Sequence, residues 1–286
     1  MRKRQGRSRT LDWTHQDVEQ RLFFRGGRYT RVNGLLTGLI GILLAVALYA
    51  ALSATPLAET AFGRIFLERG PTQHAVVVLF CWSLVILIFK RLKLGLQRRA
   101  LDVKVSPDEP GFVISPSTVD EVLRHVHEIA DDPRNFMVLN RVEVALSNLR
   151  NLGRVGDVEE ILRAQASQDE SQVETSYALI QGFVWAIPVL GFIGTVLGLS
   201  QAIGSFTAVL GSSDDVSAIT GALGKVTAGL ATAFDTTLVA LVAALIVQLL
   251  MVMIKKSEEE FLDEAIEYGI RNIVGRLRME SPGEAG

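Results

Sequence analysis

The stretch AIPVLGFIGTVLGLS, residues 186–200, carries no charged side chain and is rich in glycine and hydroxyl residues. It lies within one of four apolar runs, which cover 34–53, 75–89, 178–206 and 218–254. The only charged residues in these runs are Lys225 and Asp235. A helix of about 20 apolar residues crosses the roughly 30 Å hydrocarbon layer of a bilayer, and the last two runs exceed that length. The sequence therefore predicts an all-α integral membrane protein with four transmembrane helices at these positions.

The placement of Lys and Arg predicts which side of the membrane each segment faces, because cytoplasmic flanks retain positive charge during insertion. Nine Lys and Arg precede the first run and six occur between 90 and 104, whereas the loop 207–217 has none. Both termini are therefore expected in the cytoplasm, with the loops 54–74 and 207–217 outside. A cleavable signal peptide is the alternative for residues 1–55, but its apolar run of about 20 residues is longer than the usual 7–15.

Three charged segments are expected in the cytoplasm: a basic arm (1–33), a helical domain (90–177) and an amphipathic helix with a tail (255–286). We expect the arm to contact anionic lipids rather than nucleic acid, through Arg2, Lys3, Arg4, Arg7 and Arg9. The run 75–89 is short, so the basic residues that follow it are expected to reach the lipid headgroups with their ammonium and guanidinium groups. These residues are Lys90, Arg91 and Lys93.

Within 90–177, helices are predicted to begin at Ser115-Pro116, to cover Phe136–Leu152 and to begin again after Gly156-Asp157. The acidic group Asp169, Glu170 and Glu174 is interpreted as a solvated helix face. His125 and His127 would point to different faces of a helix, which argues against a metal site. After the last run, apolar residues recur at helical spacing and predict that this span continues as a cytoplasmic helix packed against its neighbours: Leu262, Ile266, Ile270, Ile273 and Leu277.

Small residues recur every three or four positions in the two long runs, a pattern that allows helix backbones to approach closely. In run 178–206 the pattern includes Pro188, Gly191 and Gly198, and in run 218–254 it ends at Asp235. An ionised aspartate inside a membrane costs at least about 3 kcal/mol, so Asp235 is expected to face a bundle interior, a partner or water. A pore-facing role and a purely structural, hydrogen-bonding role both stay open for this residue.

The stretches Ile187–Gly198 and Gly229–Ala244 resemble the MotA/TolQ/ExbB proton channel family. The order of a short pair of spans, a cytoplasmic insert and a long pair of spans is similar as well. The resemblance implies a pentamer in a bacterial inner membrane, arranged around a dimer of single-span MotB/TolR/ExbD-like partners that carry an intramembrane Asp. It also implies that protons or sodium ions passing through the assembly drive rotation or a pulling motion.

By the same resemblance, Thr195 and Thr237 correspond to pore-facing hydroxyls, and Pro188 to a proline at the channel mouth. Thr232 stands where some ExbB-like members carry a glutamate. The expected ion pathway comprises Thr195, Thr232, Asp235, Thr236 and Thr237. The residues expected to pack or kink the helices are Pro188, Gly191, Gly194 and Gly198.

The sequence predicts a channel subunit of an ion-driven motor complex rather than an enzyme, because it shows no nucleophile–base pair, metal cluster or phosphate loop. Its single cysteine, Cys81, excludes a disulfide within the chain and a cysteine-based zinc site. No cofactor is expected. A membrane scaffold that holds a partner without conducting ions is the alternative, and the polar stripes of the two long runs favour conduction.

Overall fold

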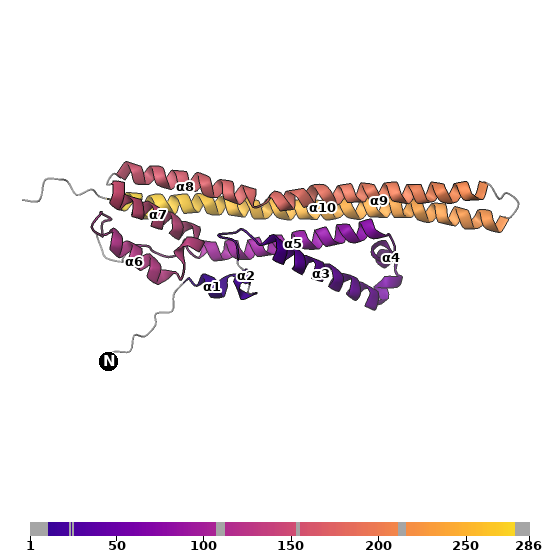
Figure 1. Cartoon of the computed structure of the whole chain (residues 1–286), viewed down its shortest axis with the longest axis horizontal. Helices are drawn as coiled ribbons and strands as arrows, with labels where there is room; N and C mark the ends of the chain where they lie inside the picture. Colours follow the sequence, from indigo (N-terminus) through magenta and orange to yellow (C-terminus); the bar gives the residue numbers. More distant parts are fainter. Residues whose placement is uncertain are drawn as a thin grey trace, which may run out of the picture. The chain divides into compact units, whose positions relative to one another are not determined.

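A computed structural model describes residues 11–22, 24, 26–106, 112–152, 155–210 and 216–277. Within these ranges the chain is helical, without a β-strand beyond isolated bridges, and four helices are long and apolar enough to cross a membrane (Figure 1). These helices are α3 (Gly34–Ala54), α5 (Pro71–Arg98), α9 (Ala178–Leu210) and α10 (Val216–Asn272). The predicted fold class, an all-α protein with four transmembrane helices, is confirmed.

The chain divides into two compact units. The membrane unit contains residues 34–87 and 178–253, and the peripheral unit contains the segments before, between and after them. The boundaries fall inside α5, after Leu87, and inside α10, after Met253. The remaining elements are α1 (Trp13–Gln16), α2 (Val18–Arg21), η1 (Pro56–Glu59), α4 (Ala61–Leu67), α6 (Val119–Ile129), η2 (Pro133–Asn135), α7 (Met137–Leu152), α8 (Val155–Thr175) and η3 (Val274–Arg276).

In the membrane unit, α3 packs against α5 through two glycines that leave room for Trp82. A Cβ atom on Gly41 would lie 2.6 Å from the Cα atom of Trp82, and one on Gly38 would lie 2.8 Å from its indole ring. The indole N–H of Trp82 donates to the hydroxyl of Thr37 at 3.3 Å. One face of α5 therefore packs against α3. A neighbouring face, which includes Val76, packs with Ile187 of α9 and with alanines of α10.

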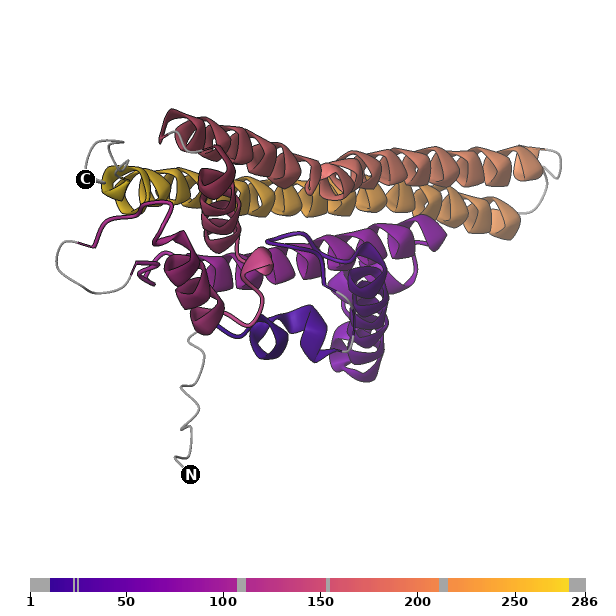
Figure 2. The ribbon, with the colours of Figure 1, turned by 60° about the vertical axis from the view of Figure 1, so that its left-hand side comes forward.

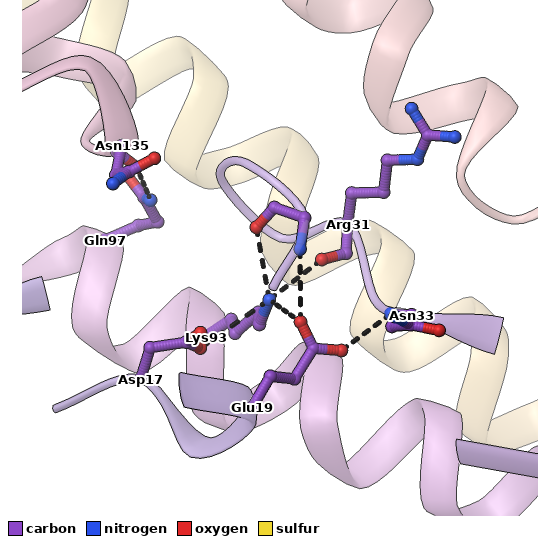
Figure 3. A network of polar contacts seen from close by, with 8 residues as sticks. Asp17, Glu19, Arg31, Asn33, Lys93, Gln97 and Asn135 are labelled. Atoms are coloured by element: carbon purple, nitrogen blue, oxygen red, sulfur yellow. Dashed lines mark hydrogen bonds and ion pairs between the residues drawn. The ribbon is translucent and has the colours of Figure 1, made fainter. Parts of the chain in front are cut away.

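In the peripheral unit, Asp17, Glu19 and Arg31 of the arm contact a buried lysine of α5 (Figure 3). Lys93 has no exposed side-chain surface, and its Nζ atom lies 2.5 Å from Glu19 and 3.5 Å from Asp17. The same ammonium donates to the carbonyls of Gly27 and Arg31, at 3.2 and 2.9 Å. This part of the arm is thus folded onto the protein, whereas the bases between Arg2 and Arg9 lie outside the described residues.

The expectation that Lys90 and Lys93 extend to lipid headgroups is wrong. The Lys90 side chain is buried as well, 3.4 Å from Glu258 of α10, and it donates to the hydroxyl of Ser176 at 2.7 Å. Its ammonium also lies 4.0 Å from the centroid of the Tyr177 ring. Both lysines have carboxylate partners that are distant in sequence, and apolar periodicity does not reveal such partners.

The interpretation of Asp169 as part of a solvated face is also wrong, although its neighbours Glu170 and Glu174 are exposed. Asp169 is 1% exposed and accepts a 2.6 Å hydrogen bond from Arg141 of α7.

The predicted start of α6 also differs from the structure. Thr118 accepts from the Ser115 N–H at 2.9 Å and donates to the Val113 carbonyl, so residues 115–118 form a turn and α6 begins only after Thr118.

The other helix predictions for this unit agree with the structure to within a few residues. Helix α7 begins one residue after Phe136, and α8 begins at Val155, so that Gly156 and Asp157 lie in its first turn. Helix α10 runs without a break to Asn272, as expected for a span that continues beyond the membrane. In the subunit alone, Leu262 is buried, whereas Ile266 and Ile270 are exposed.

Candidate ion pathway

Helices α9 and α10 run side by side (Figures 1 and 2), and glycines set how closely they approach. A Cβ atom on Gly198 would lie 2.6 Å from the carbonyl oxygen of Gly229, and one on Gly229 would lie 2.7 Å from the carbonyl oxygen of Gly198. A Cβ atom on Gly191 would lie 2.6 Å from the Cβ atom of Ala240, and one on Gly194 would lie 2.6 Å from the hydroxyl oxygen of Thr236. Since a side chain at these positions would meet backbone or buried atoms, the helices contact each other almost backbone to backbone.

This close approach brings Thr195 of α9 and Thr237 of α10 together, 42 positions apart in the chain, so that their hydroxyls form a hydrogen bond. The Thr195 hydroxyl is also 3.2 Å from the Gly191 carbonyl and 3.1 Å from the Ala233 carbonyl. The Thr237 hydroxyl is 3.2 Å from the same two carbonyls. Two hydroxyls and two carbonyls therefore form one small polar cluster, which we call the hydroxyl pair.

The hydroxyl pair has more acceptors than protons. Each hydroxyl carries a single hydrogen, and each can direct it to the other threonine or to either carbonyl. Rotation of one hydroxyl exchanges one hydrogen bond for another at little cost. Both side chains are partly exposed, so their free lone pairs are available to water or to a protonated group.

The other two threonines of the expected pathway are placed differently. Thr236 is 1% exposed, and its hydroxyl donates to carbonyls of its own helix, at Thr232 and Ala233, while the side chain lies against Gly194. The Thr232 hydroxyl donates to the Ala228 carbonyl at 3.0 Å. Neither residue is a member of the hydroxyl pair.

Asp235 has a partner that sequence reasoning missed. Its carboxylate lies 2.7 Å from the guanidinium of Arg69, which also reaches the Thr232 hydroxyl at 3.4 Å. Arg69 lies between α4 and α5, within the loop 54–74 that is expected outside the membrane. The available signal was the shortage of bases near the apolar part of α10, which left Arg69 as a candidate counter-ion for Asp235.

Pro188 lies inside α9, where its ring nitrogen has no hydrogen to donate to the carbonyl of Val184 one turn earlier. It precedes the first glycine of the α9–α10 contact, Gly191, by three residues.

Among the described residues, no group of three or more His, Cys, Asp or Glu side chains is placed to hold a metal ion.

Comparison with known proteins agrees with the geometry. Residues 135–267 match the model of the MotA/TolQ/ExbB proton channel family, over just under half of the chain. The matched segment contains α9, the hydroxyl pair and most of α10. No curated protein and no solved structure matches the chain. The four apolar helices indicate a multi-pass membrane protein, and its residues 135–267 are similar to the MotA/TolQ/ExbB proton channel family.

Proposed function

We propose that the chain is the channel-forming subunit of an ion-driven motor complex. Five copies surround a dimer of single-span partners in a bacterial inner membrane, with both termini of the subunit in the cytoplasm. The observation that carries the proposal is the hydroxyl pair, since it places two partly exposed hydroxyls side by side in the apolar part of α9 and α10. The family match supports the channel chemistry, and small-residue packing of the kind seen between α9 and α10 supports a ring of identical copies.

In this proposal Thr195 and Thr237 form hydrogen bonds with the partner's carboxyl group, which carries the proton. A partner carboxylate that is ionised accepts a hydrogen bond from one of the two hydroxyls, and a protonated carboxyl group donates to a hydroxyl oxygen. When a hydroxyl turns toward the partner, the carbonyls of Gly191 and Ala233 lose one donor, and the other threonine can replace it. The pair can therefore serve both protonation states of the partner without an unpaired buried group.

The test replaces Thr195 and Thr237 by valine, singly and together. Valine keeps the shape of the side chain and removes the hydroxyl. The complex is purified from its own membrane, its mass is measured by native mass spectrometry, and proton uptake into liposomes is followed under an imposed potential. Because each lost hydrogen bond is worth about 0.5–1.5 kcal/mol and the loss recurs in every subunit, we expect flux to fall at least about tenfold in the double variant.

The matched control is Thr227→Val. Thr227 is an exposed threonine of the same helix, and its hydroxyl bonds only to carbonyls of α10, at Leu223 and Gly224, among the described residues. This variant should conduct like the unsubstituted complex. Unchanged flux in an assembled Thr195→Val, Thr237→Val variant would instead show that the hydroxyl pair only joins α9 to α10. An assembled, unsubstituted complex that does not conduct would support the non-conducting scaffold. A monomer in mild detergent would contradict the ring.

A further inference from the structure

The ion pair between Arg69 and Asp235 connects the segment just before α5 to the first half of α10. One guanidinium nitrogen lies 2.7 Å from the Asp235 carboxylate, and the other lies 3.4 Å from the Thr232 hydroxyl one turn earlier. The exposed fractions of the two charged side chains are 18% and 24%, so most of each is shielded from surrounding solvent or lipid. A charge-assisted contact of this geometry fixes the position of the short segment before α5 along α10.

Asp235 lies on a different face of α10 from Thr237. The two residues are two positions apart, which places them about 200° apart around a helix. Asp235 shares its stripe with Val239, Val242 and Ile246, whose side chains line an apolar cavity of about 450 Å³ together with residues of α3, α4 and α5. The carboxylate therefore points toward the first pair of spans, and the hydroxyl pair lies on the side of α10 that contacts α9.

The surroundings of the start of α5 agree with an anchoring role. Thr72 lies near Gly194 and Thr236, since a Cβ atom on Gly194 would be 3.1 Å from the Thr72 hydroxyl. One turn further along α5, Val76 packs in the cluster that contains Ala240. Arg69, just before α5, and Thr72 and Val76 of α5 thus lie against the part of α9 and α10 that holds the hydroxyl pair.

We infer that Arg69 is a positioning residue that anchors α5 to α10 through Asp235, and that the Asp235 carboxylate does not carry the transported ion. The anchor holds the first pair of spans against the hydroxyl pair. Only the statement about the transported ion rests on the proposed function, because the anchor itself is a property of the folded subunit.

The anchor is tested by a charge exchange. Arg69→Gln and Asp235→Ala each remove one partner, and the exchange variant Arg69→Asp, Asp235→Arg restores a pair of the same total length. The thermal midpoint of the purified complex in detergent is the readout, which needs no ion flux. Loss of one partner of this largely shielded pair should lower the midpoint by about 6 °C or more, and the exchange variant should recover at least half of the loss.

The control for the anchor is Arg64→Gln. Arg64 is an exposed arginine of α4, five residues before Arg69, and its replacement should leave the midpoint unchanged. Additive losses in the exchange variant would overturn the anchor. So would a midpoint that does not respond to either single substitution.

The statement about the transported ion is tested in liposomes with a neutral pair, Arg69→Gln with Asp235→Asn. This double variant retains hydrogen-bonding groups on both sides and leaves no unpaired buried charge. We expect its proton flux to stay within about threefold of that of the unsubstituted complex, since the hydroxyl pair is intact. A flux loss as large as that of Thr195→Val, Thr237→Val in a normally assembled complex would overturn this statement. If the unsubstituted complex does not conduct at all, the proposed function fails, whereas the midpoint measurements still decide whether the anchor exists.

Discussion

Removing the carboxylate of Glu19 should release the N-terminal arm from α5, whereas removing the charge of Asp17 should not. Both carboxylates are buried beside the ammonium of Lys93 (Figure 3), but their contacts differ. Glu19 accepts from Lys93 at 2.5 Å and from the backbone N–H groups of Gly27 and Asn33, at 3.1 and 2.6 Å. Asp17 contributes a longer ionic contact of 3.5 Å to the same lysine.

The magnitude follows from these contacts. Breaking a buried ion pair by deleting one partner costs about 3–5 kcal/mol, and a buried N–H that loses its acceptor adds about 1–3 kcal/mol. Because Asp17 still neutralises Lys93 after Glu19→Ala, we take about 3–5 kcal/mol as the total loss for opening of the arm. At 1.4 kcal/mol per factor of ten, this corresponds to amide exchange that is about 10²- to 4 × 10³-fold faster.

The assay is hydrogen exchange followed by mass spectrometry on peptides that cover residues 11–22 and 26–33, with the protein in detergent. Asp17→Asn is the matched variant, because it removes a buried carboxylate beside the same lysine without removing the hydrogen bonds of Glu19. Its peptides should exchange at the unsubstituted rate or more slowly at neutral pH. Equal acceleration in the two variants, or no acceleration in Glu19→Ala, would refute the assignment of Glu19 as the residue that holds the arm.

The stability that Asp17 contributes to the folded arm depends on pH. Burial raises the pKa of its carboxyl above the usual 3.8, and the charge of Lys93 offsets only part of that shift. The folded arm therefore binds a proton more readily than the unfolded arm does. The stability contributed by Asp17 is present below the unfolded pKa and is lost as pH rises through the folded value. The difference in exchange between the unsubstituted protein and Asp17→Asn should accordingly shrink on acidification.

Two further predictions concern helix packing and topology. Gly198→Ala should separate α9 from α10 and lower the thermal midpoint of the complex, because the new methyl group would lie 2.6 Å from a backbone oxygen. Gly95→Ala, on an open face of α5, should raise the midpoint slightly, because alanine is preferred over glycine in a helix by about 1 kcal/mol. Equal midpoints for the two variants would contradict the packing argument. Reporters fused after Gly286 or within 110–150 should read as cytoplasmic, and reporters within 58–70 or 208–216 as external. An external signal from 110–150 would contradict the predicted orientation.

The sequence by itself determined the class of the protein and the positions of its four long helices, although α5 (Pro71–Arg98) extends beyond the run 75–89 at both ends. Hydropathy is a local property, so the runs 34–53 and 178–206 marked α3 and α9 without knowledge of their neighbours. The stretch around Gly191, Thr195 and Gly198 also sufficed for the family resemblance, which the match over residues 135–267 confirms. The unbroken continuation of α10 beyond the membrane followed from an apolar stripe with helical period.

The tertiary structure alone decided the partners of the charged residues. Glu19 meets Lys93 across 74 positions, Asp169 meets Arg141 across 28, and Arg69 reaches α10 across more than 160. In each case the sequence showed a charge and its local surroundings, from which a solvated or lipid-facing position was the natural inference. A charge can be buried when an opposite charge and backbone dipoles compensate its lost hydration, and those groups come together only when distant helices pack. For the same reason the sequence left the role of Asp235 open, whereas the fold pairs its carboxylate with Arg69 and turns it away from the hydroxyl pair.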